Sequence, residues 1–206
     1  TPALARSSVA VRMKPYSLAR QRMNSRFEDI PHRLFLDSST LQTLQRYGGF
    51  IYENDELGDR DPIHRDPVGV EKLDALRNIM RVAQRAPFEF ALSENSLHEV
   101  EARNDAQYLQ WAYDVLDHWL TCLEESTQRL GPPRVAALLD SQAHGYLGAG
   151  DRALLKDAIL LGCDSFLTME NRLPRNAAHI QASVGLRVLS PIGMWLLLRP
   201  WAPLFY

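Results

Sequence analysis

Residues 33–40 read RLFLDSST, a short apolar run that ends at an acid followed by three hydroxyl residues. Three consecutive apolar residues, 34–36, are typical of a strand that is buried on both faces. Asp37 follows at once, and the hydroxyl residues 38–40 are side chains that commonly begin a helix. The stretch therefore predicts a strand-to-helix unit with an acid at the junction.

Further strands and helices alternate along the chain. Apolar side chains at helical spacing predict a helix that starts near Pro67 and ends before Pro87, and residues 88–92 then read as a second strand. Two more strands are expected over residues 165–168 and 184–189, with a helix from Asp151 to Leu161. This alternation favours a three-layer α/β/α domain around a mainly parallel central sheet.

The clearest helical periodicity covers residues 108–123. Its apolar positions recur every three or four residues over four turns: Tyr108, Trp111, Ala112, Val115, Leu116, Trp119, Leu120 and Leu123. Such a stripe is typical of one amphipathic helix whose aromatic face is buried. We expect this face to pack in the core or to form the interface of a homodimer.

Composition and cysteine usage exclude several classes. With 206 residues, 46% hydrophobic and 23% charged, the chain resembles an ordinary soluble domain. Cys122 and Cys163 are the only cysteines and no CxxC pair exists, so a disulfide framework is excluded and a zinc site is not expected. The apolar residues 192–206 are interrupted by an arginine and two prolines, so they predict a packed C-terminal tail and no membrane span.

Charge divides the chain unevenly. Residues 1–33 hold seven basic and two acidic residues, while the whole chain has a net charge of −2. This basic N-terminal arm is either a solvated extension or a strip that contacts nucleic acid. We expect a domain over residues 34–191 with an acidic loop and helix inserted at about 50–87. The N-terminus shows no long apolar run, so a cytoplasmic protein is expected.

Four acids occupy positions that a parallel sheet brings to one edge. Asp37 follows the first strand, Glu170 lies two residues beyond residues 165–168, Asp151 opens the preceding helix, and Glu99 lies on the helix after the second strand. Ligand-binding groups collect at the carboxyl edge of such sheets. Several carboxylates on one edge suit Mg²⁺ or Mn²⁺. We predict that these acids are catalytic and bind the metal.

Each acid also has a simpler structural interpretation. Asp37 and Asp151 could serve as N-caps, Glu99 could complete a capping box with Ser96, and Glu170 could be a surface residue. Under these interpretations the chain needs no metal.

Neighbouring polar residues are candidates for supporting roles. Ser39 and Thr168 could orient an acid or a water molecule, or they could hydrogen-bond to the backbone. Arg172 and Arg175 follow Glu170 and are suited to hold a substrate phosphate, although exposed arginines often have no specific role.

Three stretches also follow the order of a known family: RLFLDSS at 33–39, FALSENSLHEV at 90–100 and DRALLKDAILLGCDSFLTMEN at 151–171. Together they resemble the PIN domain, a family of metal-dependent ribonucleases that includes many bacterial toxins. The last stretch carries most of the resemblance, because its acid, helix, glycine, strand, threonine and second acid fall at similar spacing. Glu170 stands where most relatives have Asp.

The resemblance implies an endoribonuclease that uses Mg²⁺ or Mn²⁺ and a metal-activated water to hydrolyse RNA, leaving a 3′-hydroxyl and a 5′-phosphate. It also implies an antitoxin protein as a partner that would cover the groove. The alternatives are a toxin-like chain defined mainly by that partner, and a non-catalytic PIN-like module that binds nucleic acid or protein. A phosphatase with an Asp nucleophile is disfavoured, because Ser39 stands where a second Asp is usual.

Overall fold

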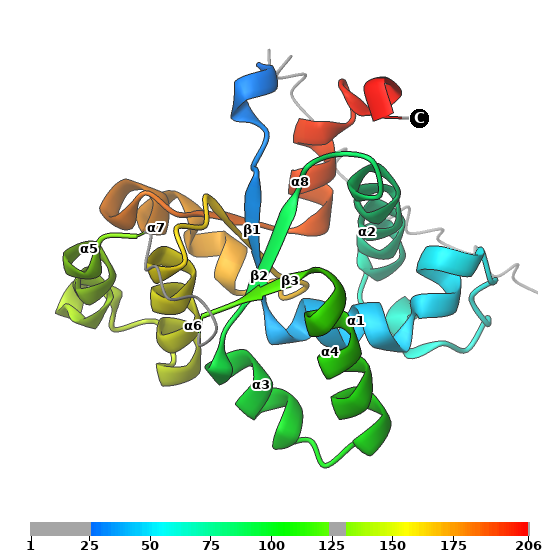
Figure 1. Ribbon diagram of the computed structural model, residues 1–206, viewed down its shortest axis with the longest axis horizontal. Coiled ribbons are helices and arrows are strands. Elements are labelled where there is room, and N and C mark those ends of the chain that lie inside the picture. Colours follow the sequence, from blue (N-terminus) through cyan, green and yellow to red (C-terminus); the bar gives the residue numbers. More distant parts are fainter. Residues whose placement is uncertain (1–25, 124–130, 206) are drawn as a thin grey trace, which may run out of the picture.

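A five-stranded, all-parallel sheet forms the centre of the structure, a computed structural model that describes residues 26–123 and 131–205 (Figure 1). Its order is β3-β2-β1-β4-β5. The strands are β1 Arg33–Leu36, β2 Glu89–Leu92, β3 Leu120–Cys122, β4 Ser165–Leu167 and β5 Arg187–Leu189. The central strand β1 pairs with β2 on one side and with β4 on the other. The expected α/β fold around a parallel sheet is confirmed.

Helices cover both faces of this sheet. They are α1 Ser38–Arg46, α2 Gly69–Ala83, α3 Glu94–Glu101, α4 Ala106–Trp119, α5 Pro133–Ala137, α6 Ala149–Leu160, α7 Ala177–Val184 and α8 Pro191–Leu198. In Figure 1, α5, α6 and α7 lie on one side of the strands, and α2 and α8 lie on the other.

Alternation along β1 explains the two cores. Successive side chains of a strand point to opposite faces. Leu34 and Leu36 therefore join the cluster formed with α1, α2, α4 and α8, whereas Phe35 joins the cluster formed with α5, α6 and α7. Phe35 stacks on Phe166 of β4 with ring centroids 5.3 Å apart. Because all three residues are fully buried, β1 reads as a continuous apolar run.

The structure differs from the sequence prediction at β3. The helix expected over residues 108–123 ends at Trp119, and residues 120–122 pair in parallel with residues 90–92. Leu120 already has the extended backbone angles φ −99° and ψ 138°. The prediction of a helix to Leu123 is wrong, because a short apolar run satisfies helical spacing and strand burial equally well.

The stripe on α4 faces the core over much of its length. Tyr108, Ala112 and Leu116 are buried, while Trp111 and Val115 line an apolar cavity of about 410 Å³ beside α2. The homodimer stays a prediction.

The ends of the described chain pack together. Residues 1–25 of the basic arm lie outside the described residues. Ile30 is buried, and the ring of Phe27 meets Trp201 edge to face at 5.4 Å between centroids. The apolar tail folds as α8 and a short 3₁₀ turn, Ala202–Phe205. Within residues 26–123 and 131–205, no helix combines the length and the apolar character that crossing a membrane requires.

The inserted segment ends in α2. A π-helical turn, Gly49–Glu53, and a 3₁₀ turn, Pro62–Arg65, precede this helix. α2 begins at Gly69, two residues later than the sequence predicts. Asp66 does not cap it directly; instead its Oδ1 accepts a hydrogen bond from the amide of Val68 at 3.1 Å.

Candidate active site

The carboxyl ends of β1 and β4 form a switch point of the sheet. The two strands are neighbours, with Leu36 opposite Leu167. The chain leaves β1 through α1 toward one core and leaves β4 through α7 toward the other. In open parallel sheets, ligands bind in the crevice at such a point. Asp37 and Thr168 are the first residues beyond these two strands.

Asp37 is held by two hydroxyl groups. It is only 7% exposed, and its Oδ2 accepts hydrogen bonds from Ser39 Oγ at 2.5 Å and from Thr168 Oγ1 at 2.7 Å. Asp37 occupies the N-cap position of α1, but its side chain makes no capping hydrogen bond. The carboxylate is therefore oriented by side chains from both strand ends and does not act as a cap.

Glu99 has a different setting from the one that the capping-box interpretation predicts. Ser93 is the N-cap of α3 and forms a capping box with Ser96, so the pairing of Ser96 with Glu99 is wrong. The Oε2 atom of Glu99 instead accepts a hydrogen bond from Ser38 Oγ. Its Oε1 atom would lie 3.4 Å from a Cβ atom placed on Gly150. Glu99 thus reaches from α3 to the start of both α1 and α6.

Asp151 lies in the first turn of α6 and is half-buried. The helix begins at Ala149 with Gly148 as its N-cap, so the interpretation of Asp151 as the N-cap is wrong. A carboxylate in this turn interacts favourably with the free amides of the helix N-terminus. A hydrogen bond of 2.7 Å from Asn95 Nδ2 to Asp157 Oδ2 ties α3, which carries Glu99, to α6, which carries Asp151.

Glu170 completes the group of acids. The residue is exposed overall, but partial loss of solvent contact at its carboxyl raises the pKa above the ordinary value. The negative charges of Asp37, Asp151 and Glu99 raise this pKa further, and the nearby Arg172 opposes them. The charges of the other three predicted acids therefore act on Glu170 at one edge of the sheet. We call Asp37, Glu99, Asp151 and Glu170 the acidic rim.

The two predicted arginines differ in their placement. Arg172 lies beside Glu170 and its Nη2 donates a 3.0 Å hydrogen bond to the carbonyl of Tyr146. Arg175 is exposed in the turn Leu173–Asn176. Among residues 26–123 and 131–205, no hydrogen bond or ion pair joins its side chain to the acidic rim.

Two residues next to the acidic rim were missed from the sequence. The sequence indicates only a helix-start role for Ser38, although its hydroxyl donates to Glu99. Tyr108 of α4 donates a 3.4 Å hydrogen bond to the carbonyl of Ser38. Burial, with smaller contributions from Asp37 and Glu99, raises the pKa of Tyr108 to about 12. Tyr108 is therefore neutral, and its hydroxyl is hydrogen-bonded to the first residue of α1.

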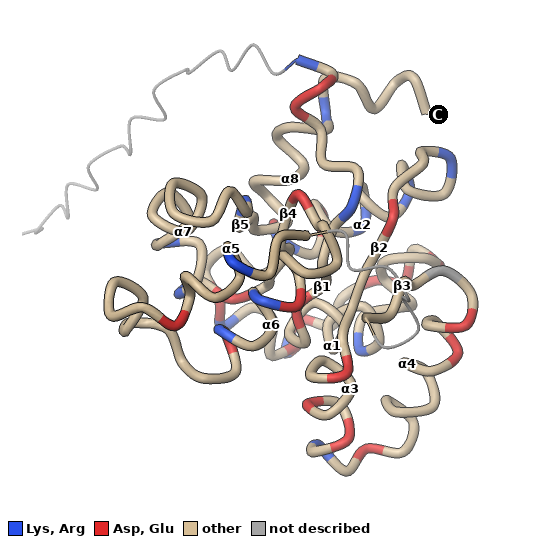
Figure 2. The backbone as a smooth tube through the Cα atoms, turned by 60° about the vertical axis from the view of Figure 1, so that its left-hand side comes forward, with Lys and Arg blue, Asp and Glu red and all other residues tan. Residues whose placement is uncertain are grey.

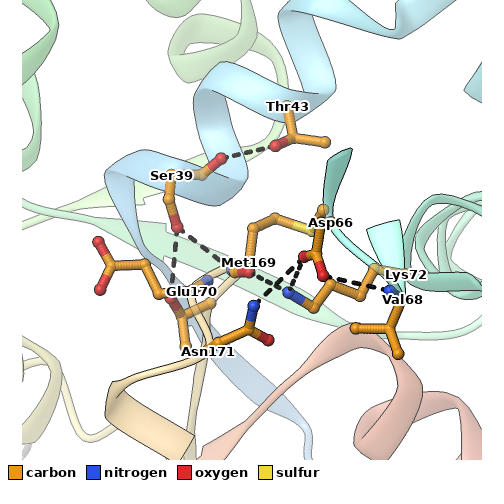
Figure 3. Close-up of polar contacts among 9 residues, drawn as sticks. Ser39, Thr43, Asp66, Val68, Lys72, Met169, Glu170 and Asn171 are labelled. Atoms are coloured by element: carbon orange, nitrogen blue, oxygen red, sulfur yellow. Dashed lines mark hydrogen bonds and ion pairs between the residues drawn. The ribbon is translucent and has the colours of Figure 1, made fainter. Parts of the chain in front are cut away.

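A third residue missed from the sequence is Lys72 of α2, which is buried against the β4 loop (Figure 3). Its Nζ donates to Asp66 Oδ2 at 2.9 Å and to the carbonyl of Met169 at 2.6 Å. The sequence carries one signal of this role, because Lys72 stands four residues before Leu76 on the apolar stripe of the helix.

The acidic rim offers the donor chemistry of a hard divalent ion, since all four side chains are carboxylates. Asp37 keeps its Oδ1 free of hydrogen bonds to the described residues. Within that same part of the chain, no three His, Cys, Asp or Glu side chains are spaced to ligate a single ion. The acids therefore fit Mg²⁺ or Mn²⁺ by the chemistry of their oxygen atoms.

No family model, no curated protein and no solved structure matches this chain.

Proposed function

We propose that this protein is an endoribonuclease that depends on Mg²⁺ or Mn²⁺ and binds the metal at its acidic rim. One observation carries the proposal: four acids from separate parts of the chain converge where β1 and β4 end, and the charges of three of them raise the pKa of the fourth. Titratable groups that perturb one another in this way are concentrated at functional sites.

The structural alternatives for these acids are weaker in the folded protein. Asp37 makes no capping hydrogen bond, Glu99 is outside the capping box, and Asp151 is not an N-cap. No Lys or Arg forms an ion pair with any of the four within residues 26–123 and 131–205. Like charges gathered without a bonded cation lower stability, so their gathering is best explained by a cationic ligand.

The chain's own residues have separable roles in this proposal. Ser39 and Thr168 fix the Asp37 carboxylate, and Ser38 fixes Glu99. A bound divalent ion would supply an activated water and offset charge on the phosphate. Arg172 stands beside Glu170 and would hold a neighbouring phosphate.

Charge and sequence resemblance favour a particular substrate and approach. Most of the charged positions along α3 and α4 are acidic, so a polyanion is repelled from that end of the molecule (Figure 2). The side of the rim that carries Arg172 is the favourable approach. RNA is preferred over DNA because residues 33–39, 90–100 and 151–171 resemble the PIN domain family. An antitoxin partner stays a prediction.

Incubation of the purified protein with mixed single-stranded RNA, in millimolar Mn²⁺ or in EDTA, tests the proposal. We expect cleavage in Mn²⁺ and none in EDTA, with 5′-phosphate on the products. An equal DNA mixture serves as the substrate control. RNA that is bound in both conditions and cleaved in neither would contradict the proposal and favour a non-catalytic binding module.

A further inference from the structure

Lys72 places a charged group where an apolar side chain would be expected. Its side chain is 3% exposed, and it lies among the buried residues of α2 such as Leu73 and Leu76. Burying an ammonium group costs free energy unless its hydrogen bonds and charge are matched. A methionine of similar length would fill the same space without that cost. The charge at position 72 therefore calls for an explanation beyond packing.

Two partners on opposite sides bind the buried ammonium group of Lys72. Asp66, from the inserted segment, supplies the matching charge at 2.9 Å, and the pKa of its carboxyl is lowered, chiefly by the hydrogen bond from Lys72. The carbonyl of Met169, in the loop that follows β4, takes the second hydrogen bond at 2.6 Å. The lysine therefore joins the insertion to the residue immediately before Glu170.

Further hydrogen bonds complete the same attachment around Glu170. Asn171 Nδ2 donates to Asp66 Oδ2 at 3.3 Å, so the residues on both sides of Glu170 are tied to the Asp66–Lys72 pair. On the sheet side, the amide of Met169 donates to Ser39 Oγ at 3.2 Å and the amide of Glu170 donates to Thr168 Oγ1 at 3.1 Å. The backbone of the loop is thus held from two directions.

The side chain of Glu170 takes no part in this attachment. In Figure 3 its carboxylate points away from the amine of Lys72. Lys72 can therefore act on Glu170 through the backbone of the loop and not as its counter-ion. This distinguishes a positioning residue from a cation that would compete with the metal.

We propose that Lys72, paired with Asp66, is a positioning residue that fixes Glu170 at the acidic rim. The metal-binding part of this inference rests on the proposed function, whereas the effect on the loop does not. It gives the insertion at residues 50–87 a role, because the insertion delivers both members of the pair. Residues that orient a metal ligand without touching the metal commonly change metal affinity about 10–100-fold.

Two measurements on Lys72→Met test the inference separately. Hydrogen exchange of the intact protein should show amides 168–172 exchanging about ten-fold faster or more, with β2 unchanged. Calorimetric titration should show Mn²⁺ affinity falling about ten-fold or more. The matched control is Lys156→Met on α6, which removes an exposed ion pair to Asp140. It should change neither the exchange of amides 168–172 nor the affinity for Mn²⁺.

The possible outcomes distinguish the positioning role of Lys72 from the proposed metal site. Unchanged or uniformly raised exchange in Lys72→Met overturns the positioning role, whatever the metal does. If amides 168–172 exchange faster in Lys72→Met but the parent protein binds no Mn²⁺, the attachment of the loop is supported and the metal site is overturned. If Lys72→Met fails to fold, Asn171→Ala decides, because Asn171 is exposed and its loss removes only one hydrogen bond of the attachment. Faster exchange at residues 168–172 then supports the role, and parent-like exchange overturns it.

Discussion

The hydroxyl of Thr168 donates a 2.7 Å hydrogen bond to Oδ2 of Asp37, across 131 residues of chain. The bond joins the carboxyl ends of β1 and β4, the two strands between which the chain changes direction. Thr168 also accepts the amide of Glu170 at 3.1 Å. One buried side chain therefore links the most buried acid of the rim to the most exposed one.

Replacement of Thr168 by Val should disturb both acids while keeping the shape of the side chain. The free energy of unfolding should fall by about 2 kcal/mol, because a buried hydrogen bond to a charged group is lost. Urea unfolding measures this fall, and titration with Mn²⁺ should show weaker binding. Thr40→Val is the matched control, since the buried hydroxyl of Thr40 donates to the carbonyl of Leu167 at 3.0 Å and not to an acid of the rim. Mn²⁺ affinity that falls equally in both variants would argue against a specific role for Thr168.

Replacement of Glu170 by Gln should stabilise the metal-free protein at neutral pH. The pKa of Glu170 is raised in the folded state, so this group favours folding below its ordinary value of 4.5, and the benefit is lost as pH rises through the raised value. At pH 7 the ionised side chain therefore destabilises the folded protein, and Gln removes this effect. Thermal melts in EDTA should show a higher Tm at pH 7 and no gain near pH 3.5.

Glu56→Gln provides the comparison for this experiment. Glu56 is exposed in the inserted segment, so its replacement should leave the pH dependence of Tm nearly unchanged. In Mn²⁺ the order should reverse, because Glu170→Gln loses a carboxylate that binds the ion. A lower Tm for Glu170→Gln in EDTA at pH 7 would show that the acids are not under mutual repulsion.

Much of the fold could be predicted because its signals are local. Residues 34–36 form a buried strand and Asp37 follows it, as the apolar run indicates. The third strand was not predicted, because Leu120 and Leu123 continue the helical spacing of α4 and only pairing with β2 makes residues 120–122 a strand. The fate of such a short segment depends on neighbours that lie far away in sequence.

The site was predictable in its acids but not in what holds them. Acids at strand ends follow from the topology of a parallel sheet. The bond between Ser38 and Glu99 spans 61 residues, and that between Lys72 and Met169 spans 97. No local pattern encodes such pairs. The capping box lies three residues earlier than the sequence predicts, because Ser93 and Ser96 offer the same hydroxyl and the fold uses the first as the N-cap.

Removal of residues 1–25 should weaken RNA binding and leave the chemistry in place. The segment holds five basic and no acidic residues. If all five contact phosphates, the slope of log K against log salt should flatten by roughly 3.5 for single-stranded RNA. Binding measured in EDTA at several salt concentrations checks this. Unchanged affinity and slope would show that the segment does not contact RNA.

Isosteric variants of the acidic rim test whether its acids bind a divalent ion for catalysis. Asp37→Asn, Glu99→Gln and Asp151→Asn keep shape and hydrogen-bonding oxygens but remove a charge each. If these acids only supported the fold, the changes at the half-buried Glu99 and Asp151 would cost about 1 kcal/mol or less and spare any activity. If they bind the metal, folding should persist or improve.

The decisive measurement is the rate of Mn²⁺-dependent RNA cleavage by these three variants at a temperature where all are folded. Glu56→Gln and Asp59→Asn, two exposed acids of the insertion, are the controls. We expect cleavage to fall about 100-fold or more in each rim variant and to stay at the parent's rate in both controls. Metal-dependent cleavage retained at the parent's rate in Glu99→Gln and Asp151→Asn would contradict it.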